Sequence, residues 1–166
     1  MNKRFLTFIM TVVIILSTAL PVFAEESLPT TVYAEDGSSV IYYSDGSTLT
    51  FSPIRITEEA ASSRATATTI NADKDVTYKD ANGDVSWKYT LTATFSYEYG
   101  ISSTCTSTSY KKSISNNSWS FSDGSATKSG NVATGNGTFK YKVLLITIKT
   151  YNIDIHLTCD KYGNVT

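Results

Sequence analysis

The chain has 166 residues, with 14 lysines and arginines against 15 aspartates and glutamates, and a formal net charge of −1 at pH 7. Hydrophobic residues make up 41% and charged residues 17% of the chain, a composition that excludes an intrinsically disordered protein. The sequence also lacks the basic patch with interleaved aromatic residues that is typical of nucleic-acid-binding proteins. Eleven tyrosines, many threonines and only three prolines favour strands.

The first 24 residues have the parts of a secretory signal peptide. A positively charged start precedes an apolar run over residues 5–20, and Val22 and Ala24 are of the kind that signal peptidase accepts before a cut. The sequence therefore predicts cleavage between Ala24 and Glu25, and a freely released extracellular protein. A membrane-spanning helix needs about 20 apolar residues, and neither this interrupted run nor any later segment provides them.

An acidic segment over residues 25–65 follows the predicted signal peptide. Residues 25–64 contain seven acidic residues and two arginines, a net charge of −5, whereas residues 65–166 carry a net charge of +2. This asymmetry predicts a boundary in the small, polar stretch that ends near Arg64 and Ala65. The segment is a docked arm, a flexible linker, or a prosegment that is cleaved near Arg64, and the sequence leaves these alternatives open.

Two turn signals divide the acidic segment into a short β-hairpin arm. Asp36-Gly37 and Asp45-Gly46 suit type I′ turns, in which both central residues take positive φ. Such an arm is too small to be stable alone. The β-prone runs that flank the turns are Thr31–Tyr33, Val40–Tyr43 and Thr48–Phe51.

The main domain, residues 66–166, has its clearest element at Val85–Tyr97. Hydrophobic and polar residues alternate over this stretch without a break, which predicts a long strand with one buried face. Asn82-Gly83 is typical of the hairpin turn that would join this strand to another at Val76–Tyr78.

A second long strand is predicted at Tyr151–Cys159, again from strict alternation. The apolar residues upstream occupy the opposite phase, so a register change must fall between Thr147 and Thr150. No helix signal has comparable quality, and two packed antiparallel sheets are the expected fold. The shorter strands and the turns between them are Thr104–Tyr110, Ser118–Ser122, Asp123-Gly124, Asn131–Ala133, Gly135-Asn136-Gly137 and Gly137–Val143.

Cys105 and Cys159 are the two cysteines of the chain. An even number of cysteines in a secreted protein favours one disulfide, Cys105–Cys159, over two free buried thiols. Trp119 lies between them with a spacing suggestive of the Cys–Trp–Cys pattern of immunoglobulin domains. However, Leu157 stands where that pattern has a tyrosine, and only a short tail follows Cys159. We therefore predict an all-β antiparallel sandwich that is at most loosely immunoglobulin-like.

His156 is the one histidine of the chain, and it shares a strand face with Asp154. A Ser–His–Asp triad needs convergent geometry and an activated serine, and no Gly-x-Ser-x-Gly motif supplies one. The alternation of the strand already explains a solvent-facing histidine. We assign no catalytic residue.

Asp80, Asn82 and Asp84 match the first three ligand positions of a calcium-binding loop. Val85 and Leu91 stand where that loop needs a glycine and a glutamate. A hairpin turn accounts for these residues without a metal, so the sequence supports only a weak calcium candidate and predicts no cofactor.

Four segments of the main domain are distinctive: DANGDVSWKYTLTATF at residues 80–95, TCT at 104–106, ATKSGNVATG at 126–135 and LTCD at 157–160. Together they resemble a family of small secreted proteins of Gram-positive bacteria with no assigned function, over roughly residues 75–163. The resemblance implies export and a β-rich domain. It implies no activity and no functional residues.

These features favour a secreted, non-catalytic β-sandwich module that binds an extracellular glycan or protein. The many tyrosines either supply a binding surface or fill half-buried strand faces. The alternative is a small secreted effector or antimicrobial-type protein, in which an acidic prosegment over residues 25–64 masks a basic domain until cleavage near Arg64. A hydrolase that uses His156 is the third hypothesis.

Overall fold

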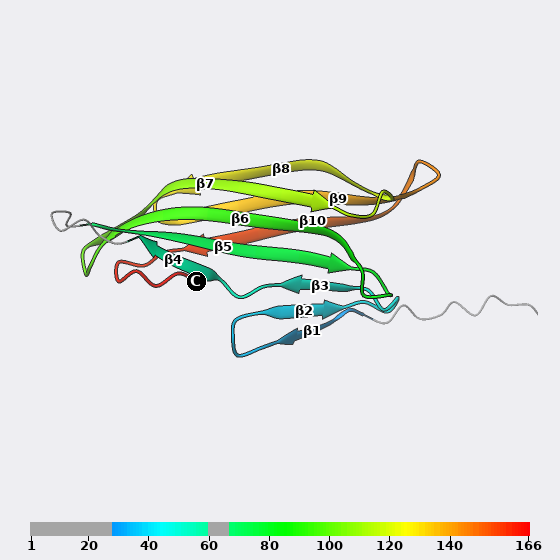
Figure 1. Cartoon of the computed structure of the whole chain (residues 1–166), viewed down its shortest axis with the longest axis horizontal. Helices are drawn as coiled ribbons and strands as arrows, with labels where there is room; N and C mark the ends of the chain where they lie inside the picture. The colour runs from blue at the N-terminus through cyan, green and yellow to red at the C-terminus, as the bar shows by residue number, and fades with distance from the viewer. Residues whose placement is uncertain (1–27, 60–66) are drawn as a thin grey trace, which may run out of the picture.

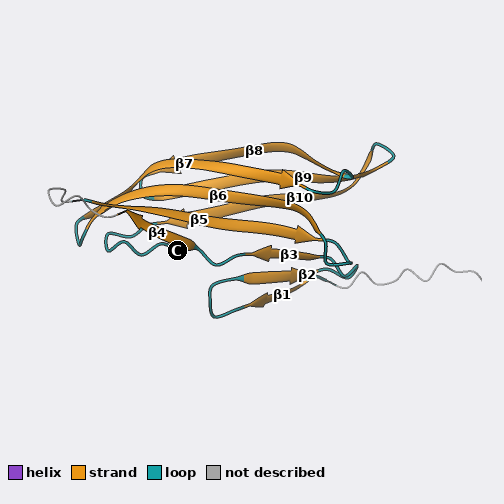
Figure 2. Cartoon of the chain, viewed as in Figure 1, coloured by secondary structure: helices purple, strands orange, loops and turns teal. Residues whose placement is uncertain are grey.

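The structure is a computed structural model that describes residues 28–59 and 67–166. The predicted cleavage site between Ala24 and Glu25 and the predicted processing site at Arg64 lie outside these residues. The described residues form ten strands (Figure 1) and include no helix that could cross a membrane (Figure 2). The strands are β1 (Thr30–Tyr33), β2 (Ser39–Tyr42), β3 (Thr48–Phe51), β4 (Arg55–Glu59), β5 (Thr68–Lys79), β6 (Val85–Glu98), β7 (Ser102–Ile114), β8 (Trp119–Ser129), β9 (Val132–Val143) and β10 (Ile146–Thr158).

The strands form two antiparallel sheets that pack on each other, so the predicted all-β sandwich is confirmed. One sheet has seven strands in the order β1-β2-β3-β5-β6-β7, with β4 also paired to β5, and the other has three in the order β10-β9-β8. In Figure 1 the chain passes from one sheet to the other between β7 and β8, which lie side by side. Most neighbouring strands are consecutive in the chain, so short hairpin turns can connect them.

The N-terminal arm joins the main sheet along β5. β3 pairs with residues 76–79 of β5, and β4 pairs with residues 69–73 of the same strand. Asp75 lies at the break between the two short strands, where Arg55 Nη1 is 2.6 Å from Asp75 Oδ2 and the Asp75 amide donates to Ser52 Oγ at 2.9 Å. The described part of the arm is therefore docked and continuous with the seven-stranded sheet.

Asp75 is a buried carboxylate that links three strands. Lys88 Nζ and Thr90 Oγ1 of β6 lie 2.8 Å and 2.6 Å from its carboxylate oxygens, in addition to Arg55 of β4. Burial raises the pKa of Asp75, but hydrogen bonds from Arg55, Lys88 and Thr90 outweigh this effect and hold the pKa at about 2. The side chain is thus ionised at neutral pH.

The predicted alternation of β6 is confirmed. Its inward row is fully buried at Trp87, Tyr89, Leu91, Ala93 and Phe95. On the outward row three threonines donate hydrogen bonds to side chains of β5, and the polar face is therefore hydrogen-bonded within itself. The pairs are Thr90 to Asp75 at 2.6 Å, Thr92 to Asp73 at 2.5 Å and Thr94 to Asn71 at 2.7 Å.

Tyr89 crosses the interior and enters a glycine-lined trough in the second sheet. Its hydroxyl lies 3.1 Å from the Ser125 carbonyl oxygen and 3.0 Å from that of Asn136. A Cβ added at Gly135 or at Gly137 would approach the Tyr89 side chain to 3.0 Å. The prediction of a turn at Gly135-Asn136-Gly137 is therefore wrong, because these glycines lie within β9 and make room for a ring from the opposite sheet.

Two irregularities mark the second sheet. The prediction of a turn at Asp123-Gly124 is wrong, since both residues lie within β8, whose pairing with β9 shifts register between Phe121 and Asp123. The Phe121 ring covers Gly124, where an added Cβ would come within 2.3 Å of it. The predicted register change in β10 is confirmed, and it falls between Thr147 and Lys149.

The turns of the arm differ in type from the prediction. In both Asp-Gly turns only the glycine has positive φ, +80° at Gly37 and +82° at Gly46, so neither is a type I′ turn. In each, the aspartate carboxylate accepts the amide of the serine two residues further on. Two consecutive residues with positive φ occur instead at Leu144 and Leu145, with φ of 48° and 71°, in the β9–β10 turn.

The predicted disulfide is absent, because Cys105 and Cys159 are free and buried. Their amides bond to adjacent carbonyls of the β8–β9 turn, so the cysteines lie at the same end of the sandwich. However, the two sulfurs contact different backbone carbonyls, those of Ser107 at 3.3 Å and Asp160 at 3.4 Å. Trp119 begins β8 at the opposite end, so the Cys–Trp–Cys spacing does not correspond to a tryptophan packed on a disulfide.

Candidate functional site

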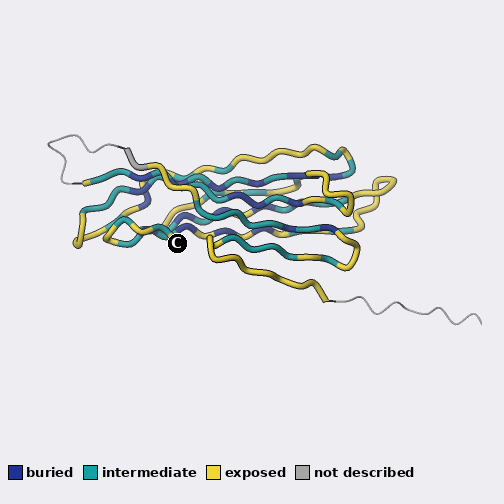
Figure 3. The backbone as a smooth tube through the Cα atoms, turned by 60° about the horizontal axis from the view of Figure 1, so that its bottom comes forward, coloured by how far each residue is buried: buried dark blue, intermediate teal, exposed yellow. Residues whose placement is uncertain are grey.

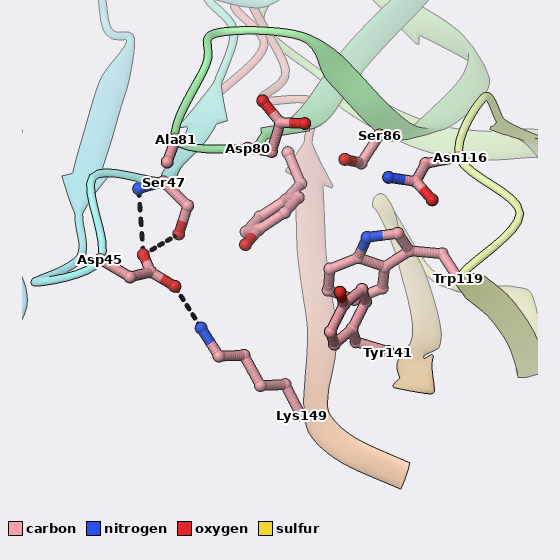
Figure 4. A pocket seen from close by; sticks show the side chains of 10 residues that line it. Asp45, Ser47, Asp80, Ala81, Ser86, Asn116, Trp119, Tyr141 and Lys149 are labelled. Atoms are coloured by element: carbon pink, nitrogen blue, oxygen red, sulfur yellow. Dashed lines mark hydrogen bonds and ion pairs between the residues drawn. The ribbon is translucent and has the colours of Figure 1, made fainter. Parts of the chain in front are cut away.

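One end of the sandwich carries a cavity of about 200 Å³. Three turns lie at this end: residues 43–47 connect β2 to β3, residues 80–84 connect β5 to β6, and residues 115–118 connect β7 to β8. Figure 4 shows side chains from both sheets arranged around the cavity. Loops held by a rigid sheet are a common place for binding sites. The polar lining residues are Asp45, Ser47, Asp80, Ser86, Asn116 and Lys149, and the aromatic ones are Tyr78, Trp119 and Tyr141.

The aromatic residues of the cavity belong to a larger cluster that reaches into the core. The ring centroids of Tyr78 and Trp119 lie 4.8 Å apart, and those of Trp119 and Tyr141 lie 5.2 Å apart. Deeper in the core, Trp87 stacks on Phe139 of the second sheet at 3.9 Å. Close ring pairs add stabilisation beyond the area that they bury. The cavity therefore has a firmly held apolar wall.

Ser86 is the unusual polar residue of the cavity. It is 1% exposed, and its hydroxyl has no hydrogen-bond partner among the described residues. Its carbonyl accepts the amides of Ser115 at 2.8 Å and Asn116 at 3.3 Å, which holds the residue in place. In Figure 4 the hydroxyl faces the same space as the Asn116 amide and the Trp119 indole nitrogen. A buried polar group left without a partner costs about 1–3 kcal/mol, so this hydroxyl is a candidate ligand contact.

Asp45 and Lys149 form an ion pair at the rim of the cavity (Figure 4). Hydrogen bonds from Lys149 and then from Ser47 lower the pKa of Asp45 to about 2. Because Asp45 lies in the β2–β3 turn and Lys149 in β10, the pair connects the arm to the second sheet. Both side chains stay partly exposed, so a ligand at the rim can reach them.

Tyr43 and Tyr151 pack edge to face beside the cavity, with ring centroids 5.4 Å apart. Burial raises the pKa of both phenols, and the neighbouring Tyr78 raises the pKa of each further. Both phenols are therefore neutral at physiological pH and act as packing groups with a polar tip.

Of the predicted calcium residues, only Asp80 lines the cavity. Its Oδ1 accepts the amides of Asn82 at 2.9 Å and Asp84 at 3.1 Å, so the three residues form the β5–β6 turn. Asp160 makes the same arrangement in its own turn. Hydrogen bonding within the turn thus accounts for the calcium-like spacing. Within residues 28–59 and 67–166, no three His, Cys, Asp or Glu side chains gather in a way that could hold a metal ion.

His156 lies on the outer face of β10, away from the cavity. It is solvent-facing, as predicted, with 58% of its side chain exposed. Its Nε2 lies 3.2 Å from Asp154 Oδ1, and its Nδ1 lies 3.1 Å from Thr134 Oγ1. A hydroxyl, a histidine and a carboxylate therefore meet, but on an open strand surface. A catalytic triad also needs donors that stabilise an oxyanion, and no cavity described here includes these residues.

A second hollow of about 420 Å³ lies between the β1–β2 turn, β4 and the end of the chain. Asp36, Ile56, Lys74 and Val165 are among its lining residues. Neither of the buried polar atoms that lack a partner in the described part of the chain belongs to a residue lining it. The cavity at Ser86 is therefore the stronger candidate site.

Most of this site was not predicted from the sequence. Asp45 was predicted only as a turn residue, Asp80 as a turn residue and weak calcium candidate, and Ser86 only as one polar position in an alternating strand. A usable signal was the strand order, because alternate turns of an antiparallel meander lie at the same end of the sheet. That rule predicts that the turns containing Asp45 and Asp80 lie at the same end, but it cannot show that a cavity forms between them.

Comparison with known proteins found no match: no family model matches the chain, and no curated protein or solved structure is significantly similar to it. The resemblance to secreted proteins of Gram-positive bacteria stays a prediction. Function must therefore be inferred from the cavity and its chemistry.

Proposed function

We propose that the protein is a secreted, non-catalytic binding module whose cavity holds one small polar unit of an extracellular glycan. The observation that carries the proposal is the buried Ser86 hydroxyl, which faces the cavity and lacks a partner among the described residues. The cavity, at about 200 Å³, is smaller than the roughly 300–1,000 Å³ of typical small-molecule pockets. It therefore suits a single sugar ring or a chain end.

The lining residues suit the two surfaces of a sugar. A pyranose ring has C–H faces that pack on aromatic rings, which Trp119 and Tyr141 offer here. Its hydroxyls need both donors and acceptors of hydrogen bonds. Asn116 supplies both, Asp80 accepts, and Ser86 can do either.

The absence of a catalytic arrangement at Ser86 supports a binding role. A nucleophilic serine needs a general base within hydrogen-bond reach. No side chain within residues 28–59 and 67–166 makes a hydrogen bond to the Ser86 hydroxyl. The proposal accordingly includes no reaction step.

A titration of the purified protein with a panel of neutral, N-acetylated and acidic saccharides tests the proposal. Because Trp119 lines the cavity, we expect at least one saccharide to change tryptophan fluorescence in a saturable way. Ser86→Ala and Asn116→Ala should weaken that response, and Thr134→Ala, on the open face of β9, should leave it unchanged. No response to any saccharide, or a response that both cavity variants retain in full, would contradict the proposal.

The docking of the arm favours a binding module over an effector with a removable prosegment. Removal of residues 25–64 would take away β3 and β4, which pair with β5, and would also take away Arg55, which pairs with the buried Asp75. Mass spectrometry of the exported protein separates the two functions. We expect a mature N-terminus at Glu25, whereas a start near Ala65 would favour the effector.

A further inference from the structure

The β9–β10 hairpin ends in an exposed apolar tip, residues 143–148. β8 begins at Trp119, which pairs with Tyr141, so the hairpin tip extends beyond the edge of its own sheet. In Figure 1 it reaches past the neighbouring strand ends, and Figure 3 shows this loop as exposed. The exposed fractions are 45% for Val143, 91% for Leu144, 94% for Leu145, 65% for Ile146 and 57% for Ile148. Single exposed apolar residues are ordinary, but a contiguous group of this kind marks an interaction site.

The backbone of the hairpin tip is strained. Leu144 and Leu145 take φ of 48° and 71°, the conformation that a two-residue hairpin turn requires and that Asn-Gly adopts easily. Leucine is disfavoured there, because its Cβ crowds the following carbonyl oxygen. Strained residues of this kind cluster at functional sites, and here they place two leucines at the most exposed point of the hairpin.

The hairpin behind the tip is basic. No acidic residue occurs between residues 124 and 153, whereas Lys140, Lys142 and Lys149 lie in the two strands of the hairpin. Lys149 pairs with Asp45, and neither Lys140 nor Lys142 forms an ion pair within the described part of the chain. Lys142 lies two residues behind Leu144, or about 7 Å along an extended strand.

We propose that the hairpin tip inserts into the interface of an anionic lipid bilayer. Interfacial anchors bury apolar side chains about 5–10 Å into the boundary between headgroups and acyl chains. Leu144 and Leu145 would occupy that layer, while Lys140 and Lys142 stay at the level of anionic headgroups, which attract basic residues. A second copy of the chain is a poorer occupant, because two opposed tips would bring lysines of like charge together.

The proposal is independent of the glycan proposal, although the two sites are neighbours. Tyr141 and Lys149 line the cavity and also lie at the base of the hairpin. A hairpin tip held in a bilayer would therefore keep the cavity close to the membrane surface.

A vesicle flotation assay tests insertion. The probes are vesicles of phosphatidylcholine alone and of phosphatidylcholine mixed with phosphatidylglycerol, and every variant has the same N-terminus as the native exported protein. The decisive variant is Leu144→Asn with Leu145→Gly, which removes the apolar side chains and also relieves the backbone strain. We expect it to lower binding to the mixed vesicles at least about 10-fold, while its melting temperature stays equal or rises.

Two further variants complete the test. Tyr33→Ser with Ile101→Ser removes two exposed apolar residues outside the hairpin and should bind vesicles as the native protein does. Lys140→Gln with Lys142→Gln should reduce binding to the mixed vesicles only. Native protein that binds neither vesicle, or a variant with Leu144→Asn and Leu145→Gly that binds fully, overturns the proposal. Concentration-dependent dimers of the native protein that this double substitution abolishes, without vesicle binding, would overturn it in favour of a second copy.

Discussion

Polar side chains in two parts of β6 differ in whether they have hydrogen-bond partners. Thr90, Thr92 and Thr94 each donate a hydrogen bond to a side chain of β5. Ser86 lies four residues before Thr90, at a register shift where it has no paired residue in β5, and its buried hydroxyl has no partner among the described residues. The threonine row stabilises the sheet and has its acceptors already in place, whereas Ser86 faces a cavity. The absence of a partner, and not polarity, therefore distinguishes Ser86 from the threonines of the same strand.

The largest change in stability is expected from substitution of Asp75, the most buried of the side chains that accept hydrogen bonds from these threonines. Its pKa is about 2 in the folded protein against an ordinary value of 3.8. The ionised form is therefore favoured by folding, and this stabilisation is present above about pH 4 and is lost as the pH falls toward 2. Asp75→Asn should lower the free energy of unfolding at pH 7 by about 2 kcal/mol.

Urea denaturation at neutral and acidic pH measures this effect. The Asp75→Asn variant should lose less stability than the native protein between about pH 4 and pH 2. Asp154→Asn, whose side chain is 64% exposed, is the matched control and should change little. Equal acid sensitivity of the native protein and Asp75→Asn would show that Asp75 does not stabilise the fold through its charge.

A smaller loss is expected from the middle of the threonine row. Thr92→Val keeps the shape of the side chain but removes the donor to Asp73, and should cost about 1 kcal/mol of unfolding free energy. Thr92→Ser retains a hydroxyl and should recover most of the loss. Chemical denaturation of both variants and the native protein under the same conditions measures these free energies of unfolding. If Thr92→Val leaves the free energy of unfolding unchanged, the hydrogen bond from Thr92 to Asp73 contributes nothing to stability.

A change in stability of the opposite sign is expected from substitution of Ser86. Ser86→Ala removes a buried group that lacks a partner, so the free energy of unfolding should stay the same or rise by up to about 1 kcal/mol. The same change should weaken the response to a bound saccharide. A variant that is destabilised as much as Thr92→Val would indicate that Ser86 makes a stabilising hydrogen bond, and the contrast within β6 would disappear.

No effect on stability is expected from reductant, because Cys105 and Cys159 are free thiols in the folded protein. Burial raises the pKa of both thiols, so they should react slowly in the native state. Denatured protein should bind two equivalents of a thiol reagent without prior reduction. Denatured protein with no reactive thiol, or a melting temperature lowered by reductant, would show instead that Cys105 and Cys159 form a disulfide.

The parts of the fold that could be predicted are those set by local alternation. β6 and the second half of β10 follow from the two-residue period of their sequences, and a change of phase revealed the bulge before Tyr151. Glycine was misleading in β8 and β9, because it marks either a turn or a close approach. Only the position of Tyr89 and Phe121 decides between these meanings.

The disulfide and the site required knowledge of orientation. The fold places Cys105 and Cys159 at one end of the sandwich, but the sequence alone does not show which way each sulfur points. The same limit applies to Ser86, whose neighbours in space come from turns far away in the chain. β4 was not predicted, because its sequence carries no clear pattern of its own; it is held by its backbone pairing with β5 and by the ion pair of Arg55 with Asp75.

The order of the strands has a consequence for how the chain folds. Apart from the pairing of β3 with β5, neighbours within each sheet are consecutive strands, so most hairpins can close over short loops. The contacts between the sheets span much longer stretches of chain, such as the sequence separation of 47 between Tyr89 and Asn136. Contacts of high sequence separation form slowly. We therefore expect hairpins to assemble early and the entry of Tyr89 into its glycine-lined trough to complete the sandwich late.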